Sequence, residues 1–499
     1  MKYTKRQNGI LLPLSSLPSP HGIGTMGKAA FDFVDFLKES KVNIWQMLPL
    51  NPTSYGDSPY QSFTSNGLNY YFIDLDILVE KKLLKKEEII DKDFYYDEKR
   101  VDYSLLFKNR LNLLKVAFSR FDKENKEFLA FVKEGKYRDF AFYITLKALN
   151  NYKPWYEWSD DLKKYSFVTE NKIIKEHYDD YLFYQWTQYE FLNQYKALKE
   201  YANDRGISIM GDMPLYLARD SVEAYKYPQM FLFDQELKPT LVAGCPPDYF
   251  SEDGQLWGNP IYNWKNMDKN NYMWFHQRIM NNLEIFDILR IDHFRGLSSY
   301  YVIPFGLKTA RIGQWRKGPG MDLFKGYTDL PIIAEDLGII DDEVVKLLKD
   351  TGFPGMKVLE FAFDGDDENS HLPSNSGKNS VVYTGTHDNE PLLGHLKHLS
   401  VGNLSIFKHS LKNQCSLFGV DYKDNTLEDI VKTTISLAYA DICDTAIIPL
   451  HDLLCLGNEA RINQPSVVDG NNWVYRFSKS DFTKELSNYI KENVIKYKR

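Results

Sequence analysis

Cysteine is scarce in this chain of 499 residues, and long apolar runs are absent. The four cysteines show neither CxxC spacing nor a dense framework, which argues against a disulfide or metal role and indicates reduced, mostly buried thiols. No run approaches the roughly twenty apolar residues that are needed to cross a bilayer, so we expect no membrane-spanning segment. The cysteines are Cys245, Cys415, Cys443 and Cys455.

The sequence also lacks a secretory start and an excess of basic charge. Its first residues, MKYTKRQNGILLPLSS, contain basic side chains but no apolar region of secretory length and no small-residue cleavage site. The net charge of −7 comes from interspersed charges of both signs, whereas a nucleic-acid or membrane-surface binder needs a concentrated basic face. We therefore expect a cytoplasmic protein that binds neither nucleic acid nor membranes.

Motifs for metal or nucleotide chemistry are missing as well. His293, His387 and His451 lie at or just after predicted strand ends, but none belongs to an HxH or HExxH pattern. No glycine-rich phosphate loop or dinucleotide fingerprint follows a strand. The sequence therefore predicts no metal site and no cofactor. We interpret His293 and His387 as partners for sugar hydroxyls and His451 as structural.

Aromatic residues, in contrast, are abundant. They make up 15% of the chain, with 34 Tyr, 31 Phe and 9 Trp. Sugars stack their C–H faces on aromatic rings, so the surplus suits a carbohydrate cleft, although most of these rings are expected in the core. The apolar content of 43% is ordinary for a globular protein. The length indicates either several domains or one large barrel-type domain with insertions.

Short apolar, β-rich runs that end in polar or glycine-containing turns mark eight buried parallel strands. Amphipathic helical stretches separate many of them, such as residues 29–39 and 342–350. Eight such strands with helical spacers predict an α/β fold, a (β/α)8 TIM barrel, rather than an open sheet. The expected strands are Ile10–Leu14, Ile44–Leu48, Ser208–Asp212, Ile288–Asp292, Ile332–Asp336, Lys357–Phe361, Val381–Thr384 and Ala446–Leu450.

Two gaps between the expected strands are too long for ordinary loops. Residues 75–203 have Lys, Glu, Tyr and Leu at helical spacing, which predicts a large, mostly helical insertion. Residues 215–282 alternate Gly, Pro and aromatics, which predicts a loop subdomain over the C-terminal face of the barrel. We thus divide the chain into barrel strands 1–2 with an active-site loop (1–74), the helical insertion (75–203) and barrel strands 3–8 (204–499).

Acidic residues stand at four of the expected strand ends. They are Asp212, Asp292, the Glu335–Asp336 pair, and Asp388 within Thr-His-Asp-Asn. A lone Asp after a strand is commonly a helix cap, but barrel enzymes gather their catalytic groups at the C-terminal ends of the strands. Four acidic positions at one barrel mouth therefore favour catalysis.

Paired carboxylates without a Cys/His ligand set indicate acid–base and nucleophilic work on a glycosidic bond. One carboxylate attacks the anomeric carbon, and the other holds a proton for the leaving oxygen, which needs a raised pKa. Strand alternation sends Arg290 and Asp292 to the same side, and an arginine keeps a neighbouring carboxylate ionised. The alternative for the sequence RIDHFRG is a structural ion pair that caps a strand.

A family resemblance follows from ordered motifs along nearly the whole chain. They include GILLPLSSLPSPHGIG (9–24), QMLPLNPTSYGDSPYQSFTSNGLN (46–69), GDMPLYLARDS (211–221), GQLWGNPIYNW (254–264), RIDHFRG (290–296), AEDLG (334–338), TGTHDN (384–389) and EARIN (459–463). The chain resembles amylomaltase, the disproportionating 4-α-glucanotransferase of the glycoside hydrolase clan that also contains α-amylase. The resemblance implies a retaining enzyme that transfers α-1,4-glucan segments to the 4-hydroxyl of an acceptor glucose or glucan. Its partners would be α-1,4-glucans and maltooligosaccharides, with glucose as acceptor and product.

The resemblance also implies roles for single residues. Asp292 would be the nucleophile that forms a covalent glucosyl-enzyme, Glu335 the general acid and base, and Asp388 the stabiliser of the transition state. Substrate contacts would come from Tyr55, Asp57, Asp212, Gln255, Trp257, Arg290, His293, His387 and Asn463. The few departures from the family pattern include Ile462, Ser466 where Gly is usual, Glu390-Pro391 where Asp-Thr is commoner, and Tyr301 where Trp is frequent.

Two other functions stay open from the sequence. An α-1,4-glucan hydrolase of the same clan uses the same carboxylates with water as the acceptor. A non-catalytic glucan-binding protein needs the aromatic residues but not a nucleophile, an acid and a stabiliser together. The aromatic-bearing loops at residues 55–60 and 249–264 are candidate lids that exclude water and so favour transfer over hydrolysis.

Overall fold

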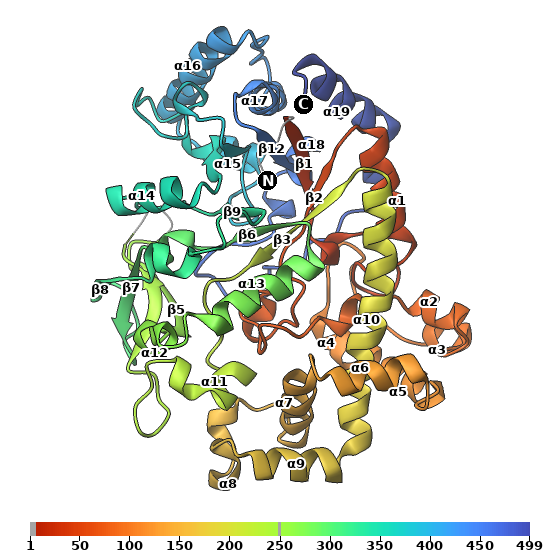
Figure 1. The fold of residues 1–499 in the computed structure, drawn as a ribbon. Helices are drawn as coiled ribbons and strands as arrows, with labels where there is room; N and C mark the ends of the chain where they lie inside the picture. The colour runs from red at the N-terminus through yellow and green to blue at the C-terminus, as the bar shows by residue number, and fades with distance from the viewer. Residues whose placement is uncertain (1–5, 248–250) are drawn as a thin grey trace.

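We describe the computed structural model of the chain for residues 6–247 and 251–499, with the exception of the side chain of Tyr55. Its centre is a sheet of eight parallel strands (Figure 1). Each observed strand overlaps one of the eight expected runs, which confirms the barrel prediction. The strands are β1 Gln7–Leu11, β2 Ile44–Gln46, β3 Ser208–Met213, β6 Ile288–Ile291, β9 Ile332–Ala334, β10 Gly355–Val358, β11 Ser380–Tyr383 and β12 Thr445–Pro449.

The strands follow one another around the barrel in chain order. The hydrogen-bonded order is β10-β11-β12-β1-β2-β3-β6-β9, with every pair parallel. Two contacts join the two ends of this sheet, β9 and β10: the amide of Ala334 donates to the carbonyl of Pro354 at 2.9 Å, and the amide of Met356 donates to Asp336 Oδ1 at 2.6 Å. Asp336 therefore serves to close the barrel.

Two strands, β1 and β10, end three residues earlier than expected from the sequence, for local reasons. After β1, Pro13 lacks the amide hydrogen that a ladder needs, and Leu14–Ser16 form a short 3-10 helix, η1. After β10, Leu359–Phe361 form the 3-10 helix η9. Residues that we expected in strands thus lie in tight turns at the barrel mouth.

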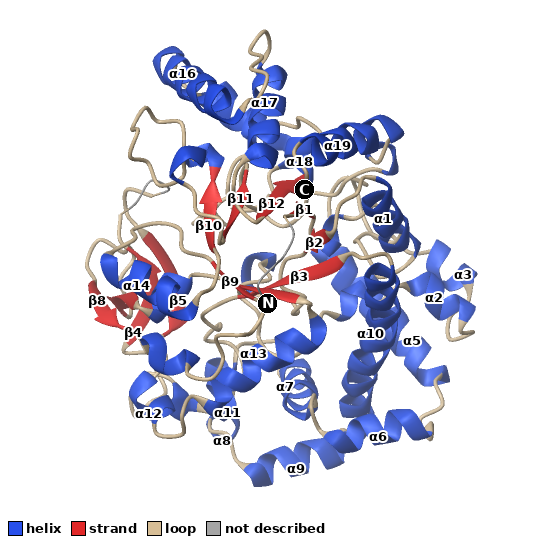
Figure 2. Cartoon of the chain, turned by 45° about the horizontal axis from the view of Figure 1, so that its top comes forward, coloured by secondary structure: helices blue, strands red, loops and turns tan. Residues whose placement is uncertain are grey.

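A layer of helices surrounds the strands (Figure 2). The two helices expected at residues 29–39 and 342–350 are present with nearly the expected bounds. The second begins where Asp341 accepts the amide of Val344 at 3.0 Å and ends at Gly352, whose φ is 70°. These outer helices are α1 Lys28–Glu39, α13 Met273–Ile285, α14 Asp342–Thr351, α15 Leu392–His398, α16 Val401–Phe418, α17 Leu427–Ala440, α18 Leu450–Leu453 and α19 Lys484–Lys496.

Between β2 and β3 the described chain forms helices that lie in the lower part of Figure 1. The longest of them, α10, has 27 residues and packs against α7 and α1. The helices are α2 Leu75–Glu80, α3 Lys86–Ile90, α4 Tyr103–Leu105, the π-helix η4 Leu106–Arg110, α5 Leu111–Arg120, α6 Lys126–Glu134, α7 Arg138–Leu149, α8 Asp160–Lys163, α9 Phe167–Glu176 and α10 Tyr178–Asp204. The segment boundaries after residue 74 and before residue 204 stay predictions.

A second sheet, which the sequence did not predict, lies beside the barrel. It has four antiparallel strands in the order β5-β4-β7-β8, namely β4 Leu241–Cys245, β5 Gln255–Pro260, β7 Ser299–Pro304 and β8 Gln314–Lys317. Two strands come from before β6 and two from after it, so the sheet extends beyond the expected subdomain at 215–282. Helices α11 Val222–Lys226 and α12 Trp264–Asp268 accompany it, whereas α13 contacts the barrel strands β3 and β6.

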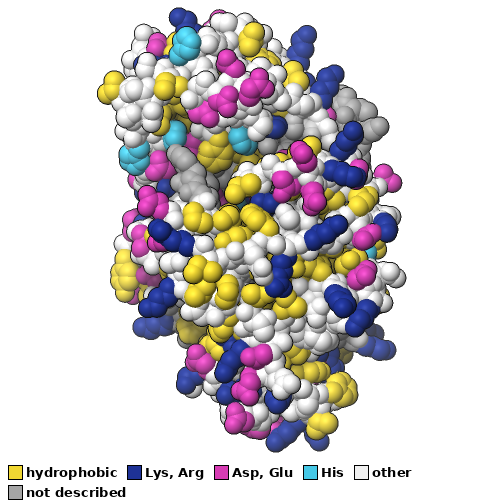
Figure 3. Space-filling model, turned by 90° about the vertical axis from the view of Figure 1, so that its left-hand side faces the viewer, with side chains coloured by type: hydrophobic (Ala, Val, Ile, Leu, Met, Phe, Trp, Pro, Cys, Tyr) yellow, Lys and Arg dark blue, Asp and Glu magenta, His cyan; other side chains and the backbone are white. Residues whose placement is uncertain are grey.

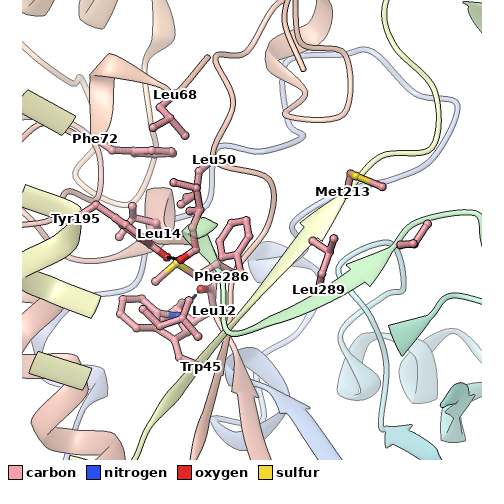
Figure 4. Close-up of a cluster of buried hydrophobic side chains, with 14 of the residues drawn as sticks. Leu12, Leu14, Trp45, Leu50, Leu68, Phe72, Tyr195, Met213, Phe286 and Leu289 are labelled. Atoms are coloured by element: carbon pink, nitrogen blue, oxygen red, sulfur yellow. Dashed lines mark hydrogen bonds between the residues drawn. The ribbon is translucent and has the colours of Figure 1, made fainter. Parts of the chain in front are cut away.

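The hydrophobic core lies between the barrel strands and the surrounding helices (Figure 4). Trp45 on β2 is fully buried there, and its indole Nε1 donates to the carbonyl of Leu12 at 2.9 Å. A smaller cluster fills the barrel interior, with Leu11, Ile44, Met210 and Ile288 among its members. The alternation of these two sets along the strands is the pattern of a barrel with both faces covered.

On the face of the molecule in Figure 3, charged side chains of both signs are interspersed with apolar ones. Across residues 6–247 and 251–499, no helix combines the length and the apolar character that a bilayer span requires. The remaining short 3-10 helices are η2 Tyr55–Asp57, η3 Tyr70–Phe72, η5 Trp155–Glu157, η6 Pro228–Met230, η7 Phe294–Leu297, η8 Gly320–Phe324, η10 Pro373–Asn375, η11 Asn458–Ala460 and η12 Lys479–Asp481.

Candidate active site

The acidic residues expected at the strand ends lie at the carboxyl ends of neighbouring barrel strands. The register pairs Asp212 of β3 with Arg290 of β6, and Ile291 of β6 with Ala334 of β9. The amide of Glu335 donates to the carbonyl of Ile291 at 3.0 Å, as part of the last of these pairs. Asp292 and Glu335 are therefore the first residues after the paired ends of two adjacent strands.

Arg290 links two of the carboxylates. Its Nη1 donates to Asp212 Oδ2 at 2.5 Å and to Asp292 Oδ1 at 3.2 Å. The side chains of Arg290 and Asp212 are almost fully buried, whereas 26% of the Asp292 side chain is exposed. Tyr60, from the loop after β2, donates its hydroxyl to Asp212 Oδ2 at 2.7 Å. The buried pair Arg290–Asp212 thus lies beneath Asp292, whose side chain is partly exposed to solvent.

Burial and crowding raise the pKa values of the two central carboxyl groups. For Asp292, burial is the largest cause, Arg290 opposes it, and Asp212, Glu335 and Asp388 raise the pKa further, well above its ordinary value. For Glu335, burial again raises the pKa, and the opposing influence of Arg290 is the second cause. Carboxyl groups that are crowded in this way cannot all be ionised at low cost, so a proton on one of them is favoured.

Glu335 is held by the backbone of its own and the neighbouring strand. Its Oε2 accepts the amide of His293 at 2.6 Å, and its Oε1 accepts the amide of Leu337 at 2.9 Å. His293 has a φ of 51°, in the left-handed region, which turns the chain so that its amide reaches Glu335. The position of the Glu335 carboxyl group therefore depends on the turn that follows Asp292.

Asp388 lies in the turn after β11 and is held by the segment that follows α18. Asn463 Nδ2 donates to Asp388 Oδ1 at 2.6 Å, and His387 Nε2 lies 3.4 Å from the same oxygen. Arg461 Nη2 donates to the carbonyl of Asp388 at 3.0 Å, and the amide of Asn463 donates to the carbonyl of His387 at 3.1 Å. The expected residues His387, Asp388 and Asn463 are thus brought together.

Aromatic rings connect these two groups of residues. Tyr60 stacks on the ring of His387, with centroids 5.1 Å apart and planes 8° apart, and Trp473 lies within 5.9 Å of both rings. Sequence reasoning did not single out Tyr60, Arg461 or Trp473. Tyr60 and Arg461 stand inside two of the quoted motifs, whereas no pattern around Trp473 signals a role.

The small antiparallel sheet contributes a third group, at the start of β5. Trp257 Nε1 donates to Gln255 Oε1 at 3.0 Å, and the Trp257 ring meets that of His293 edge-on, with centroids 4.8 Å apart. Burial, with Arg295 adding to it, lowers the pKa of His293 to about 3, so this imidazole stays neutral. The expected residues Gln255, Trp257 and His293 thus form one wall beside Glu335.

The loop after β2 carries the two remaining expected residues. The side chain of Tyr55 lies outside the described part of the structure. Asp57 is half-buried, and burial, followed by the charge of Asp102, raises its pKa to about 6. Gly56 faces Val468, because a Cβ on this glycine would lie 3.4 Å from Val468 Cγ1. This loop therefore faces the segment after Asn463 across the cleft, whereas residues 249–250 of the other expected lid lie outside the described residues.

A small hollow of about 20 Å³ lies beside Trp473, between the loops after β1 and β2. Trp473 lines this hollow and also contacts the rings of Tyr60 and His387 next to the carboxylate cluster. Other lining residues come from the loops after β1 and β2 and from the helical segment, among them Leu14, Asn51, Thr53, Tyr103 and Ile462. This hollow is smaller than a glucose unit, and its described lining includes none of the four carboxylates.

Two further features bear on the expectations from the sequence. His451 is buried, with its Nε2 3.7 Å from Asp452 Oδ1. In the part of the chain that the structure describes, no group of three or more His, Cys, Asp or Glu side chains is arranged to hold a metal ion.

Together, fold and site define a class: a (β/α)8-barrel protein with opposed carboxylates at the ends of adjacent strands, an arrangement suited to glycosidic bonds. The comparisons with known proteins identify the family. Residues 12–482 match the family model described as 4-alpha-glucanotransferase, so the chain belongs to the 4-α-glucanotransferase family. The chain is 42% identical to the 4-alpha-glucanotransferase of Clostridium butyricum, covering 96% of this chain and 97% of that protein. It is 39% identical to that of Thermus thermophilus, covering 96% of each chain.

Solved structures agree with this assignment. The structure of amylomaltase from Streptococcus agalactiae in complex with acarbose matches with a TM-score of 0.93 at 38% identity, covering 99% of this chain and 100% of that one. Amylomaltase from Corynebacterium glutamicum matches with a TM-score of 0.80 at 17% identity, covering 98% of this chain and 75% of that one, and so supports the fold alone. The resemblance expected from the motifs is confirmed.

Proposed function

We propose that this chain is a retaining transferase that moves α-1,4-glucan segments from a donor maltooligosaccharide or glucan to the 4-hydroxyl of an acceptor. The observation that carries the proposal is the opposed pair Asp292 and Glu335 beside Arg290, in a chain of the 4-α-glucanotransferase family. Glucose serves as acceptor and product, and neither nucleic acid nor a membrane takes part. Maltodextrin, glycogen and starch are the corresponding natural glucans.

Asp292 is the nucleophile. The guanidinium of Arg290, 3.2 Å away, favours the ionised form that attacks the anomeric carbon. Although burial lowers the pKa of Arg290, the charges of Asp212 and Asp292 raise it well above its ordinary value, so this group stays positive. Attack forms a covalent bond from Asp292 to the anomeric carbon as the glycosidic bond breaks.

Glu335 is the general acid and base. In this proposal Glu335 carries the proton, because burial raises its pKa and Arg290 donates its hydrogen bonds to Asp212 and Asp292. Glu335 gives this proton to the leaving glucan oxygen and then takes one from the acceptor 4-hydroxyl, which displaces Asp292. Retaining enzymes hold their two carboxyl groups about 5–5.5 Å apart, a separation that positions at the ends of two adjacent strands allow.

The remaining residues bind the sugars. Asp388, with His387 beside it, accepts hydrogen bonds from ring hydroxyls in the oxocarbenium-like transition state. Because its imidazole is neutral, His293 can accept or donate to a hydroxyl on the acceptor side. Further contacts come from Tyr55, Asp57, Asp212, Gln255, Trp257, Arg290 and Asn463.

Transfer is distinguished from hydrolysis by incubating the protein with maltotriose. We expect glucose and a ladder of longer chains, with a constant total of reducing ends. Asp292→Asn keeps the shape of the side chain but removes the nucleophile, so we expect kcat to fall by at least about 10⁴-fold with unchanged melting temperature. Asp341→Asn, at the cap of α14, is the matched control and keeps transfer activity.

Three results would each contradict a different part of the proposal. A steady rise in reducing ends indicates an α-1,4-glucan hydrolase. Binding of maltotriose without any product indicates a glucan-binding protein. Normal turnover in Asp292→Asn removes this residue from the mechanism. A cytoplasmic location also remains our proposal, supported by the lack of a disulfide bond among the described cysteines, and cell fractionation tests it.

A further inference from the structure

A second group of buried acidic side chains lies next to the turn that carries Asp388. Glu360, in η9 just after β10, is only 8% exposed, and its amide donates to the carbonyl of Thr384 at 3.0 Å. Its Oε1 accepts Asn389 Nδ2 at 3.0 Å and lies 3.8 Å from His395 Nδ1. Its Oε2 is buried without a hydrogen-bond partner among the described residues. The mechanism proposed above does not use this carboxyl group.

Asn389 connects Glu360 to the catalytic turn. Its Oδ1 accepts both the amide of Thr386, at 2.9 Å, and the hydroxyl of Thr386, at 2.8 Å. The same hydroxyl oxygen accepts the amide of Asp388 at 3.2 Å. One side-chain amide therefore ties the two ends of the 386–389 turn together, and the direction of Asp388 depends on where Asn389 is held.

The groups that face Glu360 favour its neutral form. Burial raises the pKa of Glu360 to about 8, with Asp452 and Glu390 acting in the same direction and Asn389 and Arg461 opposing them. Asp452 is fixed in place, because it accepts the Thr384 hydroxyl at 2.5 Å and the Leu392 amide at 2.7 Å. Burial lowers the pKa of His395, so this neighbour adds no positive charge at neutral pH.

We propose that Glu360 is a positioning residue for glycosyl transfer, which acts through Asn389 to hold the 386–389 turn and so aims Asp388 at the reacting sugar ring. This inference rests on the proposed role of Asp388. An ionised Glu360 has one oxygen without a partner in the interior, a state that is expelled toward water. Its departure releases Asn389, and the turn then loses the restraint on Asp388.

The variants Glu360→Gln and Glu360→Ala test this role. Glutamine has the shape of the neutral glutamate, so we expect kcat for maltotriose within about 3-fold of wild type at pH 7. Between pH 7.5 and 9 we expect kcat of this variant to fall less than kcat of wild type. Alanine frees Asn389, so we expect kcat to fall by at least about 30-fold with KM within about 3-fold, because Asp388 acts mainly in the transition state. Glu343→Gln, on the exposed face of α14, is the matched control and follows wild type at every pH.

The melting temperatures of wild type and Glu360→Gln test the buried state of Glu360 independently of activity. Folded Glu360 keeps its proton up to about pH 8, whereas an unfolded glutamate loses it near its ordinary value of 4.5. The contribution of protonated Glu360 to the free energy of unfolding is therefore present at low pH and is lost as the pH rises from about 4.5 to about 8. We expect the melting temperature of Glu360→Gln to rise relative to wild type between pH 5 and 8.

Several outcomes would overturn the inference. One is an activity profile of Glu360→Gln that superimposes on that of wild type up to pH 9. Another is a fully active Glu360→Ala, measured well below its melting temperature. Asp388→Asn separates the two proposals: if it keeps wild-type kcat, the role of Asp388 fails, and if it is inactive while Glu360→Ala is active, only the inference on Glu360 fails.

Discussion

Ser466, near the barrel mouth, has a strained left-handed backbone conformation. It follows Pro465 in a turn in which the amide of Val467 donates to the carbonyl of Gln464 at 3.3 Å, and its φ is 65°. A turn with Pro at its second position and positive φ at its third is of type II, which favours glycine there. The strain of a left-handed non-glycine residue is about 1–2 kcal/mol.

Ser466→Gly should therefore stabilise the protein. Removal of the strain exceeds the backbone entropy cost of a new glycine, about 0.5–1 kcal/mol, so we expect a gain of about 0.5–1 kcal/mol in the free energy of unfolding in urea. Ser466→Ala is the control, because it removes the hydroxyl but keeps the strain. An equal gain in both variants would point to the hydroxyl instead of the backbone.

At the scale of elements, the packing of β3 depends on the absence of a side chain at Gly211. A Cβ at this position would lie 2.0 Å from Cδ2 of Phe286, a buried ring in the linker between α13 and β6. We expect Gly211→Ala to lower the free energy of unfolding by about 3 kcal/mol or more, since overpacking forces strand and ring apart. The measurement is urea unfolding.

The control for this variant is a glycine with free space around it. Gly402 is exposed in the first turn of α16, where a Cβ would meet only Ser400 Oγ, at 3.9 Å. Gly402→Ala should leave stability unchanged or raise it by up to about 1 kcal/mol, because alanine favours a helix. Similar losses in both variants would contradict the packing argument at Gly211.

The sequence was sufficient for elements with a strong local pattern and insufficient for those set by distant contacts. The eight barrel strands are continuous apolar runs, so they were found within a few residues. In the small sheet, β5 reads QLWGNP, where glycine and proline hide the strand, and its partner β4 becomes a strand only through pairing with β5 and β7. No local pattern contains that information.

The same distinction holds for the site. Asp212, Asp292 and Glu335 could be named because each ends or directly follows an expected strand, and the register brings them together. Asp388 could be named because it stands in the turn that follows β11. Trp473 and Glu360 could not, because their importance comes from contacts with His387 and with Asn389 that arise only in the folded chain. Their roles, like those of the named residues, stay open to experiment.

At the scale of the whole molecule, the two ends of the chain meet at the end of the barrel opposite to the site. β1 pairs with β12, and the side chains of Arg6 and Arg499 converge on the last carbonyls of α17. The side chain of Arg499 donates four hydrogen bonds, with lengths between 2.6 and 3.0 Å, to the carbonyls of Ala438, Tyr439, Asp441 and Cys443. A cation at a helix C-terminus also complements the helix dipole.

Arg499→Ala should therefore destabilise the fold without altering the chemistry. Loss of these charge-assisted hydrogen bonds is expected to lower the free energy of unfolding by about 2–3 kcal/mol, while kcat and KM for maltotriose below the melting temperature stay at wild-type values. Lys496→Ala is the control, since its ion pair with Asp421 is solvent-exposed and should leave stability unchanged. A fall in kcat for folded Arg499→Ala would show instead that the closure of the barrel at this end is coupled to the carboxylates at the other.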